Sequence, residues 1–176
     1  MSVNNSYSEK QILPYKNGMV QMPAIILAIK GLDYLPEVKR TAYVVIRNET
    51  ANGKSVVNGT NVCGAQSDSG RWPAKWDPFI IGTCIKNENQ TGNMRGFLIF
   101  DTMANGISFV CDRLQAKGLF IGENVEGRYY KGNVTTPEQL AQAYQNEWVH
   151  GGLHTITPAE LNNFVSMYKQ ATVLFV

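Results

Sequence analysis

The stretch IRNETANGKSVVNGTNVCGAQSDSGRW, Ile46 to Trp72, contains a change from an apolar run to a segment rich in turn residues. An apolar run that begins before it leads directly to Glu49, a single carboxylate. The residues that follow are rich in Gly, Asn and Ser, which favour turns and side-chain hydrogen bonds to the backbone. The stretch therefore predicts a helix that ends near Glu49 and an ordered loop behind it.

The size and composition of the chain limit what it can be. Its 176 residues, 44% apolar and 17% charged, are typical of one ordinary globular domain with a sizeable core. We interpret residues 1–19 as a flexible lead-in and residues 20–176 as a single domain. The net charge of +2 is far from the strongly basic balance of nucleic-acid-binding proteins, so no nucleic acid is expected as a partner.

Hydrophobic periodicity and turn residues predict the remaining elements. Pro23 and Gly31 bracket one helix, and Pro36 opens the next. Thr136 and Thr157 each begin a capping-box pattern, which marks a helix start. The predicted helices are residues 22–30, 37–48, about 107–117, and those that follow Thr136 and Thr157; the predicted strands are 79–85 and 96–100. The outline is an α+β fold, mainly helical, with one small β-hairpin.

Several features exclude other classes of protein. No apolar run reaches the roughly 18–20 residues of a membrane span, and the polar N-terminus lacks the apolar core of a signal peptide. We therefore expect synthesis in the cytoplasm without a signal peptide. The three cysteines form no C-x-x-C pair and are interpreted as buried thiols. His150 and His154 lie four apart beside two glycines, where a metal pair is conceivable but a simple loop is favoured. No metal or organic cofactor is expected.

Glu49 has the position that acid catalysis requires. Partial burial and the negative end of a helix dipole both raise the pKa of a carboxyl group. A carboxyl that stays protonated near neutral pH can protonate the leaving-group oxygen in glycoside cleavage. The simpler interpretation is a helix-terminal Glu exposed to water beside Arg47.

Three motifs in order point to a known superfamily. Glu49-Thr50, Cys63-Gly64-Ala65-Gln66 and the segment LAQAYQ (Leu140 to Gln145) together resemble the signature of the lysozyme-like superfamily, particularly lytic transglycosylases. The run RGFLIFDTMANGISFVCDRL, from Arg95, is similar to flagellar-type N-acetylglucosaminidases of the same superfamily. The second and third motifs depart from the family pattern. The resemblance covers roughly residues 20–170 and implies a lysozyme-like fold and cleavage of peptidoglycan.

The resemblance also implies roles for individual residues. Glu49 would be the general acid and base, and Tyr144 would project at the cleft rim within reach of it. A second carboxylate would come from Glu88 or Asp68, with Asp101 a weaker candidate, unless the substrate's own hydroxyl attacks. The predicted substrate-binding residues are Gln66, Asp68, Arg71 and Trp72. Trp72 and Trp76 are equally well interpreted as aromatic anchors of the core.

The leading hypothesis is a peptidoglycan-cleaving glycosidase that acts on the bacterial cell-wall glycan, as a phage lysin or a virion-associated enzyme. One alternative is a lysozyme-like protein without catalysis that serves as a structural or glycan-binding part of a virion or secretion apparatus. A weaker alternative is a thiol hydrolase that uses Cys63 or Cys111 with a histidine.

Overall fold

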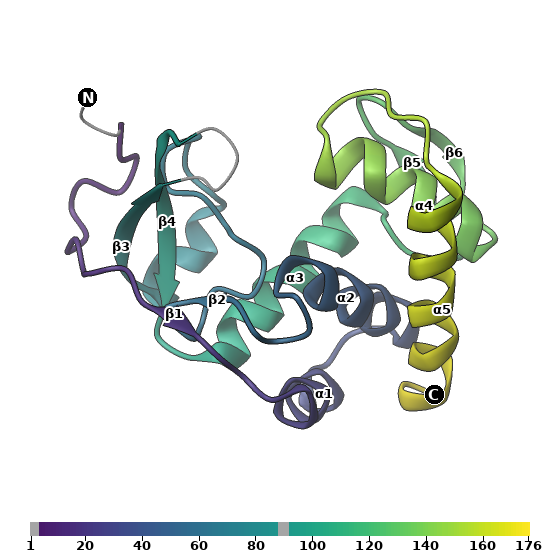
Figure 1. The fold of residues 1–176 in the computed structure, drawn as a ribbon, viewed down its shortest axis with the longest axis horizontal. Helices are drawn as coiled ribbons and strands as arrows, with labels where there is room; N and C mark the ends of the chain where they lie inside the picture. The colour runs from purple at the N-terminus through teal and green to yellow at the C-terminus, as the bar shows by residue number, and fades with distance from the viewer. Residues whose placement is uncertain (1–3, 88–91) are drawn as a thin grey trace. The chain divides into compact units, whose positions relative to one another are not determined.

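The computed structural model describes residues 4–87 and 92–176 (Figure 1). The elements, in chain order, are β1 (Asn17–Gly18), α1 (Met22–Gly31), α2 (Pro36–Glu49), β2 (Val56–Val57), the 3-10 helix η1 (Ala74–Phe79), β3 (Ile80–Asn87), β4 (Met94–Phe100), α3 (Met103–Lys117), β5 (Asn124–Glu126), β6 (Lys131–Asn133), α4 (Pro137–Tyr144), the π-helical turn η2 (Gln145–Val149) and α5 (Pro158–Leu174). The chain divides into two compact units: unit 1 comprises Met1–Ala28 and Ile46–Phe109, and unit 2 comprises Ile29–Val45 and Val110–Val176. Both units therefore combine segments that are distant in the sequence.

The α+β class predicted from the sequence is confirmed. The five predicted helices are present, and α4 and α5 begin with complete capping boxes, Thr136 with Gln139 and Thr157 with Glu160. The predicted hairpin is β3–β4. The prediction of a single hairpin is wrong, because the described residues contain two further antiparallel pairs, β1–β2 and β5–β6. These strands are two or three residues long, too short to show alternation in the sequence.

The core of unit 1 is built on β4, which is buried on both faces. Leu98 and Phe100 belong to a cluster that also contains Tyr7, Ala65, Trp76, Ile80 and Phe109. Phe97 and Ile99 belong to a second cluster, with Val57 and Cys84. Successive side chains of a strand point to opposite faces, so burial of both faces explains why residues 97–100 are apolar without interruption.

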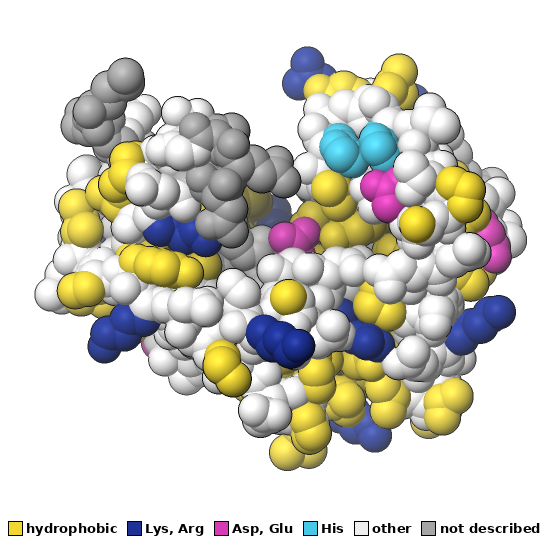
Figure 2. Space-filling model, viewed as in Figure 1, with side chains coloured by type: hydrophobic (Ala, Val, Ile, Leu, Met, Phe, Trp, Pro, Cys, Tyr) yellow, Lys and Arg dark blue, Asp and Glu magenta, His cyan; other side chains and the backbone are white. Residues whose placement is uncertain are grey.

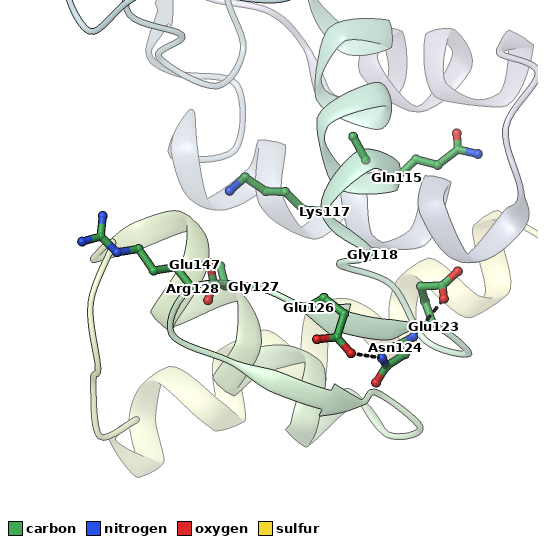
Figure 3. Close-up of a pocket in the computed structure, with 10 residues that line it drawn as sticks. Gln115, Lys117, Gly118, Glu123, Asn124, Glu126, Gly127, Arg128 and Glu147 are labelled. Atoms are coloured by element: carbon green, nitrogen blue, oxygen red, sulfur yellow. Dashed lines mark hydrogen bonds between the residues drawn. The ribbon is translucent and has the colours of Figure 1, made fainter.

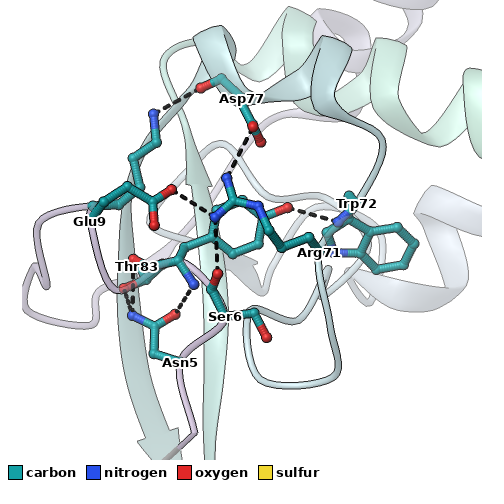
Figure 4. A network of polar contacts seen from close by, with 9 residues as sticks. Asn5, Ser6, Glu9, Arg71, Trp72, Asp77 and Thr83 are labelled. Atoms are coloured by element: carbon teal, nitrogen blue, oxygen red, sulfur yellow. Dashed lines mark hydrogen bonds and ion pairs between the residues drawn. The ribbon is translucent and has the colours of Figure 1, made fainter.

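Residues 4–19, predicted as a flexible lead-in, form part of unit 1 and pack against its other segments. The Tyr7 side chain is fully buried, and its hydroxyl accepts a hydrogen bond from the Trp72 backbone N–H at 2.9 Å. The Arg71 guanidinium lies 4.4 Å from the centre of the Tyr7 ring and donates to the Ser6 carbonyl (Figure 4). Further along, the Leu13 N–H donates to the Thr83 carbonyl. A large aromatic residue within a polar segment supplies the burial that anchors it.

Unit 2 contains the α4–α5 pair. The Tyr144 and Phe164 rings meet with their centres 5.5 Å apart. The Tyr168 hydroxyl of α5 donates to the Glu37 carboxylate of α2, and the Arg40 Nε donates to the Phe175 carbonyl at 2.8 Å. These polar contacts attach α5 to the first turns of α2 within the unit. No helix in the described part of the chain is both long and apolar enough to cross a membrane.

Candidate active site

Glu49 is the last residue of α2, as predicted. The buried face of the helix ends at Ile46, and the chain turns away at Thr50, so the Glu49 side chain is exposed. The prediction of partial burial is therefore wrong. The position of Glu49 at the negative end of a helix is as predicted. Its carboxylate is accessible there, so a proton donor at this position can reach an external substrate.

Thr50 fixes the backbone behind Glu49. Its side chain is buried, and its hydroxyl donates to the Ile46 carbonyl at 2.5 Å while accepting from the Gly53 N–H at 2.8 Å. Ala51 and Asn52 both have positive φ angles, 48° and 60°, which residues other than glycine rarely adopt. Strained backbone of this kind persists only where surrounding contacts determine it, and it is concentrated at functional sites. The carboxylate is thus presented from a rigidly held helix end.

Gly53→Ala tests how tightly this turn is built. Gly53 has φ of 83°, and a Cβ there would overlap the Val20 carbonyl oxygen, whereas Gly59, with φ of 74°, has open space around its Cα. Both substitutions incur the conformational cost of a left-handed residue, about 1–2 kcal/mol, but only Gly53→Ala adds steric overlap. We expect Gly53→Ala to lower the free energy of unfolding by about 3 kcal/mol or more, and Gly59→Ala by about 1 kcal/mol. Equal costs in urea unfolding would contradict this account of the turn.

The second motif, Cys63 to Gln66, lies along β4. The Leu98 N–H donates to the Ala65 carbonyl and the Ser67 N–H donates to the Gly96 carbonyl, both at 2.9 Å. Gln66 forms an isolated antiparallel bridge with Phe97. The segment therefore extends the β3–β4 sheet by a short stretch of backbone pairing.

Asn61 holds this segment from within. Its side chain is buried, and its Nδ2 donates to the carbonyls of Ala65 and Leu98, both at 2.9 Å. Its Oδ1 accepts from the Ala65 N–H at 2.9 Å. One amide thus satisfies both backbone groups of Ala65 and joins the segment to β4, as expected of a buried polar side chain.

Glu49 and the Cys63 end of the second motif are close enough to interact electrostatically. The pKa of the half-buried Cys63 thiol is raised, first by burial and second by the negative charge of Glu49. An electrostatic effect of this kind requires the two groups to be near one another. Residues that are 14 apart in the sequence are therefore neighbours within unit 1.

The other thiols are also poor nucleophiles. Burial raises the pKa of Cys111 to about 12 and that of Cys84 to about 11. The thiolate is the reactive form of cysteine, so none of the three thiols is activated. The structure gives no support to the hypothesis of a thiol hydrolase using Cys63 or Cys111.

Gln66 and Asp68 bind Arg95. Burial alone would raise the Asp68 pKa, but hydrogen bonds from Arg95 Nε at 2.9 Å and from the Gly96 N–H at 3.0 Å outweigh it and hold the pKa below its usual value. Arg95 also donates to the Gln66 Oε1 at 2.5 Å. Asp68 is thus an ionised carboxylate that already has strong partners.

Arg71, Trp72 and Trp76 also make contacts within the chain. Arg71 pairs with Glu9 at 2.9 Å and Asp77 at 3.0 Å (Figure 4). The Trp72 Nε1 donates to the Gln66 carbonyl, and its ring packs edge-on against Phe109. Trp76 is buried in the same cluster. Of the two interpretations of these tryptophans, the structure places Trp76 in the core and Trp72 at its edge.

Two predicted catalytic residues have different outcomes. Tyr144 is 2% exposed, so the prediction that it projects at a cleft rim is wrong. Helical spacing correctly placed Tyr144 on the same face as Leu140, but that face is covered by Phe164 of α5. Glu88 lies outside the described residues.

Unit 2 contains a hollow of about 460 Å³ between the end of α3 and the β5–β6 hairpin (Figure 3). Glu147 lies on one side of it, and its carboxylate accepts from the backbone N–H groups of Tyr129 and Tyr130. A Cβ at Gly127 would overlap that carboxylate. Glu147 thus stabilises the hairpin turn, and none of the residues predicted for the site lines this hollow.

Sequence reasoning missed Asn61 and Arg95 as organisers of the site. Their contacts reach residues 37 and 29 positions away, and no local pattern indicates such partners. The only available signal was the Asn-rich composition ahead of Gly64.

Comparison of the chain with models of protein families, with curated protein sequences and with solved structures finds no match.

Proposed function

We propose that the chain is a lysozyme-like glycosidase that cleaves bacterial peptidoglycan, with Glu49 as general acid and base. The observation that carries the proposal is the electrostatic effect of Glu49 on the Cys63 thiol, which indicates that the first two motifs of the resemblance lie in the same region of unit 1. Three further features support the same proposal: the exposed Glu49 carboxylate, the rigid turn behind it, and the backbone pairing of the second motif with the β3–β4 hairpin. The enzyme would act on the cell wall as a phage lysin or a virion component.

The setting of Asp68, one of the candidates for a second carboxylate, favours a course of reaction that uses one acid. An inverting or retaining hydrolase needs a second carboxylate as base or nucleophile. The Asp68 carboxylate already accepts hydrogen bonds from Arg95 and from the Gly96 N–H, which makes it less available for either role. In a lytic transglycosylase, Glu49 would first protonate the glycosidic oxygen and then, as carboxylate, remove the proton from the substrate hydroxyl that attacks the anomeric carbon. We therefore propose this outcome in preference to hydrolysis.

The proposed substrate-binding residues would act mainly by shaping the surface. Gln66, Asp68 and Arg71 form hydrogen bonds with partners inside the chain. They would thus hold the second motif and its surroundings in place, while glycan contacts come from backbone groups and from the exposed parts of these side chains.

Product analysis tests the proposal directly. Purified peptidoglycan is incubated with the chain, and the soluble fragments are separated and identified by mass spectrometry. The transglycosylase course predicts fragments that end in a 1,6-anhydro sugar, while hydrolysis would give reducing ends. Intact glycan strands after prolonged incubation would refute the proposal.

A non-catalytic glycan-binding protein is the second candidate. The engagement of Gln66, Asp68 and Arg71 in internal contacts favours it, because side chains already bound within the chain are less available to orient a substrate for reaction. Co-sedimentation with peptidoglycan without release of soluble fragments would support this candidate over the enzyme.

Cleavage is expected to be insensitive to thiol-blocking reagents and to EDTA. The pKa values of all three thiols are raised, so little thiolate forms at neutral pH, and the proposed chemistry uses no metal ion. Activity should stay within about twofold, the ordinary spread of such comparisons, if Glu49 alone transfers the proton. Mass spectrometry of the treated protein shows whether the thiols have been modified. Loss of activity that accompanies modification of a thiol would contradict this prediction and support the cysteine hypothesis.

A further inference from the structure

The two histidines of the chain lie side by side with a carboxylate in unit 2. The rings of His150 and His154 are stacked with their centres 3.9 Å apart and their planes within 19°. The His154 Nε2 is 3.2 Å from the Glu160 Oε2. One ligand atom from each of the three residues lies within 4.8 Å of the others. Figure 2 shows the two imidazoles (cyan) adjoining one another at the surface, with an acidic side chain (magenta) beside them.

The loop that carries the histidines is fixed at several points. The His154 carbonyl accepts from the Gln142 Nε2 at 2.7 Å, and the His154 N–H donates to the Asn146 Oδ1 at 3.2 Å. Asn146 is buried in the π-helical turn η2, and its carbonyl accepts from the Gly152 N–H. The His150 N–H donates to the Gln145 carbonyl. Both ends of the His150–His154 segment are therefore held by α4 and the turn that extends it, which limits the entropy lost when a ligand binds.

Comparison of the two capping boxes shows that the cap does not require a carboxylate at position 160. The α4 box has Gln139 at its third position and the α5 box has Glu160, yet both satisfy the cap in the same way. The hydrogen bonds from Thr157 and the contact with His154 all use the Glu160 Oε2. An amide would therefore serve the cap, so the helix start does not depend on the charge of Glu160.

We propose that His150, His154 and Glu160 bind a divalent transition-metal ion, with Zn²⁺ as the ion that fits the ligands best. Two imidazole nitrogens and one carboxylate oxygen are a common protein ligand set for Zn²⁺, which is completed by water in the fourth position. Ligand atoms around tetrahedral zinc are about 3.3 Å apart for bonds near 2 Å. The His150 side chain, which is exposed, would therefore have to turn to bring the three ligand atoms to that spacing. Mg²⁺ and Ca²⁺ prefer oxygen ligands and are not expected here.

The site goes beyond the proposed glycosidase chemistry, which uses no metal ion. Its ligands come from the loop after α4 and from the first turn of α5. A bound ion would therefore cross-link these two segments of unit 2. A ligand that binds only the native state stabilises it by an amount that grows with the logarithm of its concentration relative to Kd. The expected effect of the ion is therefore on stability rather than on turnover.

Zinc binding to the full chain, expressed without a histidine tag and stripped with a chelator, tests the proposal. Calorimetric titration with ZnCl₂ is expected to give one site per chain, and zinc at 100-fold over its Kd should raise Tm by about 5 °C or more. Because the chain has only two histidines, their imidazole NMR signals report the site directly. Both sets of signals should shift together on addition of Zn²⁺.

Three variants separate metal binding from a merely structural contact. His150→Ala and Glu160→Gln are each expected to weaken Zn²⁺ binding about tenfold or more, as loss of a ligand should cost at least as much as loss of an outer-shell partner. Glu160→Gln keeps an N3 residue that completes a capping box in α4, so the α5 helix should remain intact by circular dichroism. Glu138→Gln, the same change at an exposed first-turn residue of α4, should leave the Kd unchanged.

Cobalt provides the final check, because a cysteine could also bind the ion. Co²⁺ bound at the proposed site should give visible d–d absorption without the near-ultraviolet charge-transfer band of a thiolate ligand. Absence of binding, binding that His150→Ala and Glu160→Gln do not weaken, or a thiolate band would each overturn the proposal.

Discussion

Glu49→Gln is expected to abolish peptidoglycan cleavage while leaving the fold unchanged. The amide has nearly the shape of the carboxyl group but cannot supply a proton to the leaving oxygen, and general acid catalysis contributes about 10²–10⁴-fold to such reactions. Because the Glu49 side chain is exposed, the change should alter the free energy of unfolding by less than about 0.5 kcal/mol. Release of soluble fragments and urea unfolding, measured on the same preparation, provide the two readouts.

Two controls make the result specific to Glu49. Glu138→Gln removes an exposed carboxylate from another helix and should leave cleavage unchanged. Glu49→Asp keeps the acid but withdraws it by one methylene, so a partial loss of activity is expected because the distance to the leaving oxygen increases. Cleavage by Glu49→Gln within tenfold of the wild type would remove Glu49 from the role of acid.

Asn61→Ala is expected to cause a large loss of stability. The substitution leaves the Ala65 N–H without its partner and removes one donor each from the Ala65 and Leu98 carbonyls, all in a buried setting. An orphaned buried N–H costs about 1–3 kcal/mol and loss of a further hydrogen bond about 1 kcal/mol, so the free energy of unfolding should fall by about 3 kcal/mol. Urea unfolding with an unchanged m-value is the measurement.

The same substitution should also lower cleavage where the fold persists. Residues 63–66 lose their internal anchor, and Cys63 among them is close enough to the proposed acid to interact with it electrostatically. Asn162→Ala, the same change on the exposed face of α5, should shift stability by no more than about 0.5 kcal/mol. If both variants unfold at the same urea concentration, Asn61 does not hold the segment as inferred.

Local signals in the sequence predicted local structure well. The capping boxes at Thr136 and Thr157 involve residues within a single helical turn, so the sequence contains the whole interaction. The end of α2 at Glu49 was predicted for a similar reason, from an apolar run followed by turn residues. The β3–β4 hairpin, with its long apolar second strand, was equally visible.

Properties that depend on distant neighbours were not predictable in this way. Periodicity placed Tyr144 on a face of α4, but only the position of Phe164 decides that this face is covered. The exposure of Glu49 depends on where the chain goes after Thr50. Arg95 engages Asp68 because backbone pairing brings residues 65–67 alongside β4. Such partners follow from topology, which one sequence does not specify locally.

The division of the chain into interleaved segments has a consequence for folding during synthesis. Unit 1 needs residues up to Phe109, yet by then the ribosome has also delivered Ile29–Val45, whose partners lie in Val110–Val176. Domains usually fold as units, the N-terminal one first, but here neither unit corresponds to one continuous piece of the chain. A single cut anywhere in the gene therefore cannot yield a fragment that contains one complete unit and nothing of the other.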